Sequence, residues 1–164
     1  MSYIIGIDTG LSGAIAVINT DIGLVAIHDT PTTTVKKGKK NKNIYIESAM
    51  VDIITSYDID DMHIGLEVAQ SMPGQGVVAM FSTGEGYGLW KGIIAGLRIP
   101  ITLIRSQAWK KVMMAGMSKE KSASCYRAQQ LYPHETFFGL RGGAKDGRGD
   151  AALIATYLKQ TLNK

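Results

Sequence analysis

The chain has 164 residues, 45% hydrophobic and 20% charged, which is typical of one globular domain and excludes disordered, fibrous and two-lobed proteins. The 18 Lys and Arg against 14 Asp and Glu give a net charge of +4, which favours a polyanionic partner only weakly. With one cysteine, no signal-peptide pattern and no long apolar run, we expect a single domain over residues 1–164 in the cytoplasm.

The first half of the chain predicts four strands and a helix. Three apolar runs separated by short turns predict an antiparallel meander at residues 3–7, 14–18 and 24–28. A polar stretch over 31–43 is expected to be a loop with no buried side chains, and its lysines lie on either a hairpin extension or a strand-to-helix loop. Apolar residues at helical spacing then predict a helix over 44–56, and the run 62–66 predicts a strand that ends at Glu67.

The second half predicts mainly helices. Residues 77–97 favour one or two helical segments, with an apolar stripe that includes Trp90. Glycine recurs every four residues in this segment, at Gly84, Gly88, Gly92 and Gly96. Because glycine disfavours helix, we expect close packing on this row, either from a neighbouring helix or the sheet, or from a partner subunit or nucleic acid.

The remaining segments complete an α/β pattern. The predicted order is a strand, two helices, a Gly-rich loop and a last helix opened by Asp150, at residues 99–104, 106–114, 119–131, 140–149 and 150–162. Ser118 is the expected N-cap of the helix over 119–131. Strands alternating with helices in this order predict a mixed sheet flanked by helices.

Acidic residues stand at the ends of predicted elements. Asp8 follows the first buried strand, Glu67 follows the fourth, and Asp150 begins the last helix near Asp146. Taken one at a time, Asp8 is interpreted as a turn residue, Glu67 as a surface residue and Asp150 as a helix N-cap. Together at one sheet edge they would repel one another unless a cation neutralised them, and carboxylate oxygens suit Mg²⁺ or Mn²⁺.

Basic residues gather in two parts of the sequence. The polar stretch contains Lys36, Lys37, Lys39, Lys40 and Lys42, which form either a solvated loop or a phosphate clamp. Lys110, Lys111, Lys119 and Lys121 lie between the second and third acids, and Arg148 lies between the last two. Trp109, beside two lysines, is expected to stack or anchor at the surface. This interleaving favours a nucleic-acid substrate held through its phosphates.

In their order along the chain, five short segments resemble the RuvC-type Holliday junction resolvases of the retroviral-integrase/RNase H-like superfamily. They are IIGIDTG at 4–10, IGLE at 64–67, WKK at 109–111, SKEKS at 118–122 and KDGRGDAA at 145–152. Each segment alone is a weak signal, but the ordered set spans nearly the whole chain. The resemblance implies an RNase H-like five-stranded mixed sheet flanked by helices.

The resemblance also implies an activity. A family member would be a divalent-metal-dependent, structure-selective endodeoxyribonuclease, a homodimer that resolves Holliday junctions by paired nicks in DNA recombination and repair and leaves 5′-phosphate ends. It implies that Asp8, Glu67 and Asp150 bind two Mg²⁺ ions, which Mn²⁺ could replace. Lys121 matches a lysine near the scissile phosphate, and Lys110 matches a DNA-contacting lysine. A bacterium or a phage is the implied source.

Two positions depart from the family pattern. Many members carry an Asp or His three residues before the last Asp, where this chain has Gly147, so Asp146 is the expected substitute. The family also wedges an aromatic residue into the junction just after the second acid, whereas residues 68–72 contain none and Met72 is the expected replacement. A less selective debranching nuclease acting on forks and flaps, an RNA-directed relative and a catalytically inactive junction-binding protein therefore stay open.

Overall fold

The structure is a computed structural model that describes residues 2–38, 40–71 and 73–163. Its main sheet has the strand order β3-β2-β1-β6-β7. These strands are β1 (Tyr3–Asp8), β2 (Ala14–Asn19), β3 (Gly23–Asp29), β6 (Met62–Glu67) and β7 (Ile101–Ile104). The first three pair antiparallel, whereas β6 lies parallel to β1 and β7 parallel to β6. The predicted meander and the five-stranded mixed sheet are both confirmed.

Strand β1 lies at the centre of the sheet and is covered on both faces. Successive side chains of a strand point to opposite faces, so Ile4 belongs to one core cluster while Ile5 and Ile7 belong to the other. This explains why the run is continuously apolar rather than alternating. The strand therefore stops being buried only at Asp8.

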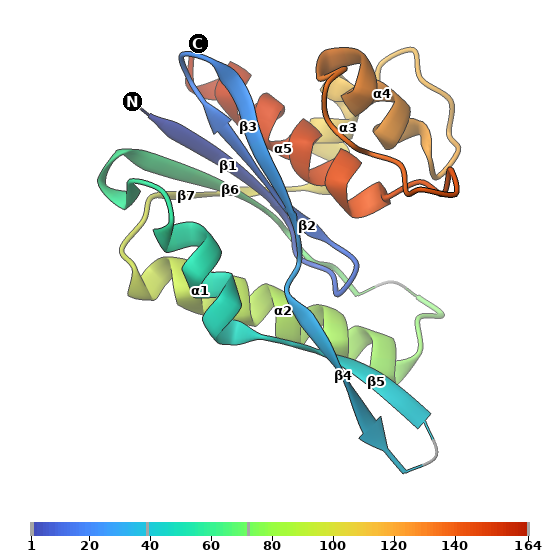
Figure 1. Ribbon diagram of the computed structural model, residues 1–164. Helices are drawn as coiled ribbons and strands as arrows, with labels where there is room; N and C mark the ends of the chain where they lie inside the picture. The colour runs from blue at the N-terminus through green and yellow to red at the C-terminus, as the bar shows by residue number, and fades with distance from the viewer. Residues whose placement is uncertain (1, 39, 72, 164) are drawn as a thin grey trace.

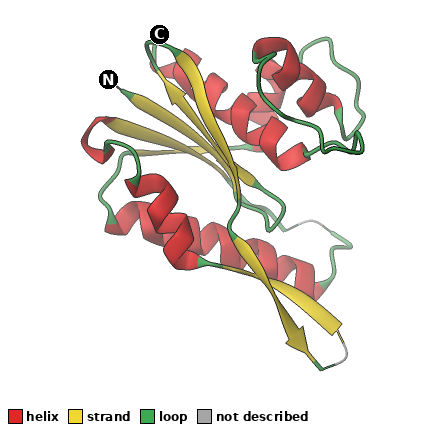
Figure 2. Cartoon of the chain, in the orientation of Figure 1, coloured by secondary structure: helices red, strands yellow, loops and turns green. Residues whose placement is uncertain are grey.

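Five α-helices cover the two faces of the sheet (Figures 1 and 2). The helices are α1 (Glu47–Thr55), α2 (Val77–Gly96), α3 (Ser106–Met113), α4 (Ala123–Leu131) and α5 (Asp146–Leu162). α1 and α2 pack on one face, and α3, α4 and α5 pack on the other. None of the helices in the described part of the chain is long and apolar enough to cross a membrane.

Of the two expectations for the polar stretch over 31–43, the hairpin extension is confirmed: the stretch forms an antiparallel two-stranded ribbon, β4 (Thr32–Lys37) and β5 (Lys40–Tyr45). This ribbon projects beyond α2 (Figure 1). The helix predicted from residue 44 begins later, at Glu47, because Tyr45 ends β5 with its side chain buried. The backbone hydrogen bonds of β4 and β5 are made between these two strands. The ribbon therefore forms although the stretch lacks the apolar alternation of a strand that packs on a core.

The expected close packing on the glycine row of α2 is absent among the residues that the structure describes. A Cβ added at Gly84, Gly88, Gly92 or Gly96 would meet nothing within 4 Å in the described residues. The opposite side of the helix faces the sheet and buries Trp90. Of the two expectations for this row, packing against a neighbouring helix or the sheet is therefore wrong.

Two helix starts also differ from the sequence expectation. α4 begins at Ala123 rather than 119, so Ser118 is not its N-cap. The last helix, α5, begins at Asp146 rather than Asp150. This second difference places Asp146 in the first turn of α5 and Asp150 one turn later on the same helix.

Candidate active site

Two of the acidic residues meet where parallel strands end together. In the parallel pairing, Ile7 of β1 lies beside Leu66 of β6, so the next residues, Asp8 and Glu67, leave the sheet at the same edge. Both side chains are half-buried. The sequence expectation that these strands end side by side is thus met by the fold.

The other two acidic residues reach this edge from α5. Asp146 and Asp150 are four residues apart on the helix, and side chains at that spacing lie on one face. The burial of Asp8 and the charges of Asp150 and Glu67 raise the pKa of the Asp8 carboxyl to about 7. Burial likewise raises the pKa of Asp150 to about 6, against a hydrogen bond from Ser124 and the charge of Lys110. The four carboxylates thus form one electrostatic cluster.

Close backbone packing fixes the start of α5 against the strands. A Cβ on Gly147 would collide with the backbone of Ser12 and Gly13 in the turn between β1 and β2. A Cβ on Gly6 would likewise collide with the backbone of α5 at Ala151 and Ala155. Position 147 therefore has no room for the Asp or His of the family pattern, and Asp146 is the neighbouring carboxylate.

Trp109 holds Glu67 in place. Its side chain is fully buried, and its indole Nε1–H donates a 3.0 Å hydrogen bond to Glu67 Oε1. The expectation that Trp109 anchors or stacks at the surface is wrong, because α3 turns the indole into the core. Trp90, which the sequence places on an apolar stripe, is also fully buried, but its Nε1 has no partner in the described residues.

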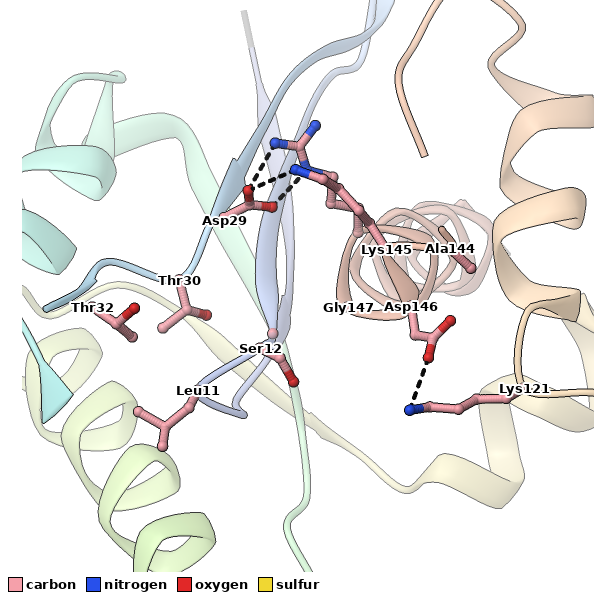
Figure 3. A pocket seen from close by; sticks show the side chains of 12 residues that line it. Leu11, Ser12, Asp29, Thr30, Thr32, Lys121, Ala144, Lys145, Asp146 and Gly147 are labelled. Carbon is pink, nitrogen blue, oxygen red and sulfur yellow. Dashed lines mark hydrogen bonds and ion pairs between the residues drawn. The ribbon is translucent and has the colours of Figure 1, made fainter. Parts of the chain in front are cut away.

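Asp146 is held on one side by Lys121. Lys121 Nζ lies 3.2 Å from Asp146 Oδ2, and the lysine side chain is 90% exposed (Figure 3). The other carboxylate oxygen, Oδ1, is buried and has no hydrogen-bond partner among the described residues. A buried carboxylate oxygen without a donor is costly unless a cation or water occupies the space beside it.

The donor set suits a hard divalent cation in charge and chemistry. Carboxylate oxygens are the ligands that Mg²⁺ and Mn²⁺ prefer, and a cation would offset the burial and the charges of Asp150 and Glu67 that raise the pKa of Asp8. As the side chains stand, however, no three His, Cys, Asp or Glu residues outside positions 1, 39, 72 and 164 form a group that could hold one ion. Asp146 contacts Lys121 through Oδ2, and Glu67 accepts the hydrogen bond from Trp109 through Oε1.

Three cavities surround the cluster. One of about 530 Å³ is lined by Asp8, Glu67 and Lys110, and one of about 550 Å³ by Lys110, Asp146 and Asp150. The third, of about 420 Å³, lies between the β1–β2 turn, Asp29 and the start of α5 (Figure 3). Each cavity opens to the surface and has at least one lysine in its lining. The positive charge of these lysines offsets the repulsion between the carboxylates and an approaching polyanion.

The structure brings some of the predicted basic residues to this edge but not all. Lys110 lies over the Trp109 ring, 5.1 Å from its centroid, and Lys119 lines the same cavity as Asp150. Lys111 is exposed on α3. Arg148 is already engaged: its Nη2 donates to Asp29 Oδ2 at 2.9 Å and its Nη1 donates to the Thr136 carbonyl at 3.1 Å.

The remaining predicted DNA contacts are the lysines of residues 36–42 and Met72. Lys36, Lys37 and Lys40 are exposed and Lys42 is half-buried, so most of these ammonium groups face solvent. Lys39 and Met72 fall outside the described residues. The position of a wedge after Glu67 therefore stays a prediction.

Comparison with known proteins gives one curated relative and several similar structures. No protein-family model matches the chain. The chloroplastic Holliday junction resolvase MOC1 of Chlamydomonas reinhardtii is 30% identical over 92 residues, which are 56% of this chain and 10% of that protein. This chain therefore covers about a tenth of that relative's length.

The similar structures share the whole fold. RuvC of T. thermophilus in complex with Holliday junction substrate has a TM-score of 0.61 at 8% identity, with 98% of this chain and 96% of that chain covered. A second Thermus thermophilus RuvC structure gives 0.58 at 10% identity, with 97% and 96% covered. The RuvC and RNase H-like fold implied by the sequence resemblance is thus confirmed.

Proposed function

We propose that residues 1–164 act as one nuclease domain, a divalent-metal-dependent endodeoxyribonuclease that resolves Holliday junctions by paired nicks. The observation that carries the proposal is the gathering of Asp8, Glu67, Asp146 and Asp150 at one edge of a RuvC fold. The resolvase activity named for the partial relative supports the same substrate. Phosphodiester hydrolysis at such an edge leaves a 5′-phosphate when water attacks the phosphorus and the 3′-oxygen departs.

In this proposal the four carboxylates hold two Mg²⁺ ions, which supply an activated water and stabilise charge on the leaving oxygen. Trp109 fixes one oxygen of Glu67, so this carboxylate is oriented before substrate binds. Lys121 exchanges its contact with Asp146 for a phosphate oxygen and offsets the charge that develops there. Lys110 contacts the strand in the cavity beside Asp8.

The DNA arms in this proposal lie across the basic residues that flank the carboxylates. Lys110, Lys111 and Lys119 bind phosphates on one side, and the ribbon lysines bind phosphates on the other. Arg148 contributes to DNA binding only if it leaves Asp29. We further propose a homodimer, because two sites are required to nick two strands, and the open glycine row of α2 offers a surface on which a second copy can pack closely.

A less selective debranching nuclease that cuts forks and flaps is the second candidate. One observation favours it: residues 68–71 carry no aromatic side chain that could open the centre of a junction. Replacement of that wedge by Met72 is the corresponding proposal for a junction-selective enzyme.

The two candidates separate in one cleavage assay. Labelled four-way junction, Y-fork, linear duplex and RNA–DNA hybrid are each incubated with Mg²⁺, with Asp8→Asn as the control. Symmetric nicks on the junction alone support a resolvase, and equal cutting of fork and junction supports a debranching nuclease. Asp8→Asn should lower the rate at least about a thousandfold while junction binding persists, since several kcal/mol of transition-state stabilisation are removed. Binding without cutting by the native protein would contradict both candidates.

A further inference from the structure

The two faces of the β4–β5 ribbon carry different chemistry. The antiparallel register places Thr34 opposite Asn43 and Lys36 opposite Asn41, while Lys37 lies opposite Lys40. Because side chains alternate along a strand, four of these residues share one face, which we call the amide face: Thr34, Lys36, Asn41 and Asn43. Lys37 and Lys40 lie on the other face. Positive charge is therefore not spread evenly over the ribbon: one face combines amide and hydroxyl groups with a single lysine, and the other face carries Lys37 and Lys40.

The amide face lies beside the sheet edge that carries Asp8, Glu67, Asp146 and Asp150, which we call the carboxylate edge. Asn41 and Asn43, with Lys42 between them, line a cavity of about 810 Å³. Gly10 and Thr83 line this cavity and also the cavity that contains Asp8. At the base of the ribbon, the buried Tyr45 hydroxyl lies 3.3 Å from the carbonyl oxygen of Thr9 and the same distance from that of Ser82. Nucleotides next to a strand held at Asp8 would therefore meet this face first.

The amide groups retain hydrogen-bonding capacity. Thr34 Oγ1 donates to Asn43 Oδ1 at 2.9 Å, which orients that amide and leaves its N–H groups for another acceptor. Asn41 is exposed, and its side chain makes no hydrogen bond within the described residues. A neutral amide binds phosphate less strongly than an ammonium does, but it matches the paired donor and acceptor on a purine edge.

We propose that the ribbon enters the major groove of one DNA arm and that Asn41 and Asn43 contact base edges there. The major groove admits a two-stranded ribbon, and an Asn amide pairs with N6 and N7 of adenine. Strands of six residues span about 20 Å, enough to follow the groove past several base pairs. Lys37 and Lys40, on the opposite face, reach the phosphates that border the groove. This inference rests on the proposed DNA substrate.

The test is a binding selection that does not require cleavage. Junctions with randomised base pairs in the arms are bound without divalent metal, and the bound fraction is sequenced. The native protein should enrich adenine at fixed arm positions about tenfold, the effect of one paired amide contact. Asn41→Ala with Asn43→Ala should abolish that enrichment, whereas the matched pair Lys37→Ser with Lys40→Ser should keep it and bind more weakly overall.

A second arm of the experiment changes only the DNA. Replacing the enriched adenines with 7-deazaadenine removes the N7 acceptor and should weaken binding of the native protein about tenfold. No enrichment by the native protein, enrichment that survives both Asn substitutions, or indifference to 7-deazaadenine would each overturn the inference. Enrichment without any cleavage would instead contradict the nuclease proposal and leave base contact by the ribbon standing.

Discussion

The carboxylate edge and the ribbon both belong to the proposed DNA surface, yet they are built in opposite ways. At the edge, Gly6 and Gly147 let backbone touch backbone, and the acidic side chains are half-buried among core elements. In the ribbon, β4 is almost wholly exposed and only Tyr45 of β5 is buried. Substitutions at the edge should therefore change stability and chemistry together, whereas substitutions in the ribbon should change binding alone.

The largest loss of stability is expected where the backbones touch. Gly147→Ala forces a Cβ into Ser12 and Gly13, and overpacking of this kind should lower the free energy of unfolding by about 3 kcal/mol. Gly143→Ala is the matched control, because its Cβ would meet nothing within 4 Å. Urea denaturation measures both. Equal stability of the two variants would mean that the turn and α5 can separate at no cost.

The charge cluster should make stability depend on pH. Asp8 titrates at about 7 in the folded protein against 3.8 for an ordinary carboxyl, so the folded state holds a proton that the unfolded chain has already released. The metal-free protein should therefore lose stability as pH rises from about 4 to 7. Asp8→Asn should reduce that loss and leave the part that comes from Asp150, because burial raises the pKa of that carboxyl to about 6.

The measurement for this prediction is the thermal midpoint at pH 5 and pH 8, with and without Mg²⁺. Added Mg²⁺ should raise the midpoint of the native protein at pH 8 and leave the midpoint of Asp8→Asn nearly unchanged. A native midpoint that rises with pH would show that the cluster is not under repulsion.

A smaller effect on stability, with a clear effect on rate, is expected at Trp109. Trp109→Phe removes the donor to Glu67 Oε1 and should slow cleavage roughly tenfold, the cost of losing a group that orients a ligand. Trp90→Phe removes the same volume from the other core, where the indole Nε1 has no partner in the described residues. Both variants should lose similar stability, but only Trp109→Phe should lose rate; equal rates would remove Trp109 from the site.

The smallest effect on the fold is expected in the ribbon. Changing Lys36, Lys37, Lys39, Lys40 and Lys42 to Ser should leave the free energy of unfolding within about 0.5 kcal/mol of its native value. For every one of these lysines that binds a phosphate, its removal should reduce the slope of log binding constant against log salt by about one. Titration of junction binding at several salt concentrations measures this slope. An unchanged slope would mean that the lysines are only solvated.

The sequence by itself determined the ends of the central strands. An apolar run that stops at an acid marks where burial stops, and this is a local property, so Asp8 and Glu67 were predictable as strand ends. The antiparallel meander was predictable for the same reason. The ribbon was predictable only as one of two alternatives, a hairpin extension or a strand-to-helix loop. Its strands bury almost nothing, and apolar periodicity is the signal on which a strand prediction depends.

Only the tertiary structure decided which neighbours these residues have. The start of α5 at Asp146 depends on contact of Gly147 with a turn more than 130 positions earlier in the sequence, as the residue numbers show. The indole of Trp109 reaches Glu67 across 42 positions, and the glycine row of α2 faces away from the chain's own core. Such contacts arise from packing between distant segments, and the local pattern of a sequence carries no record of them.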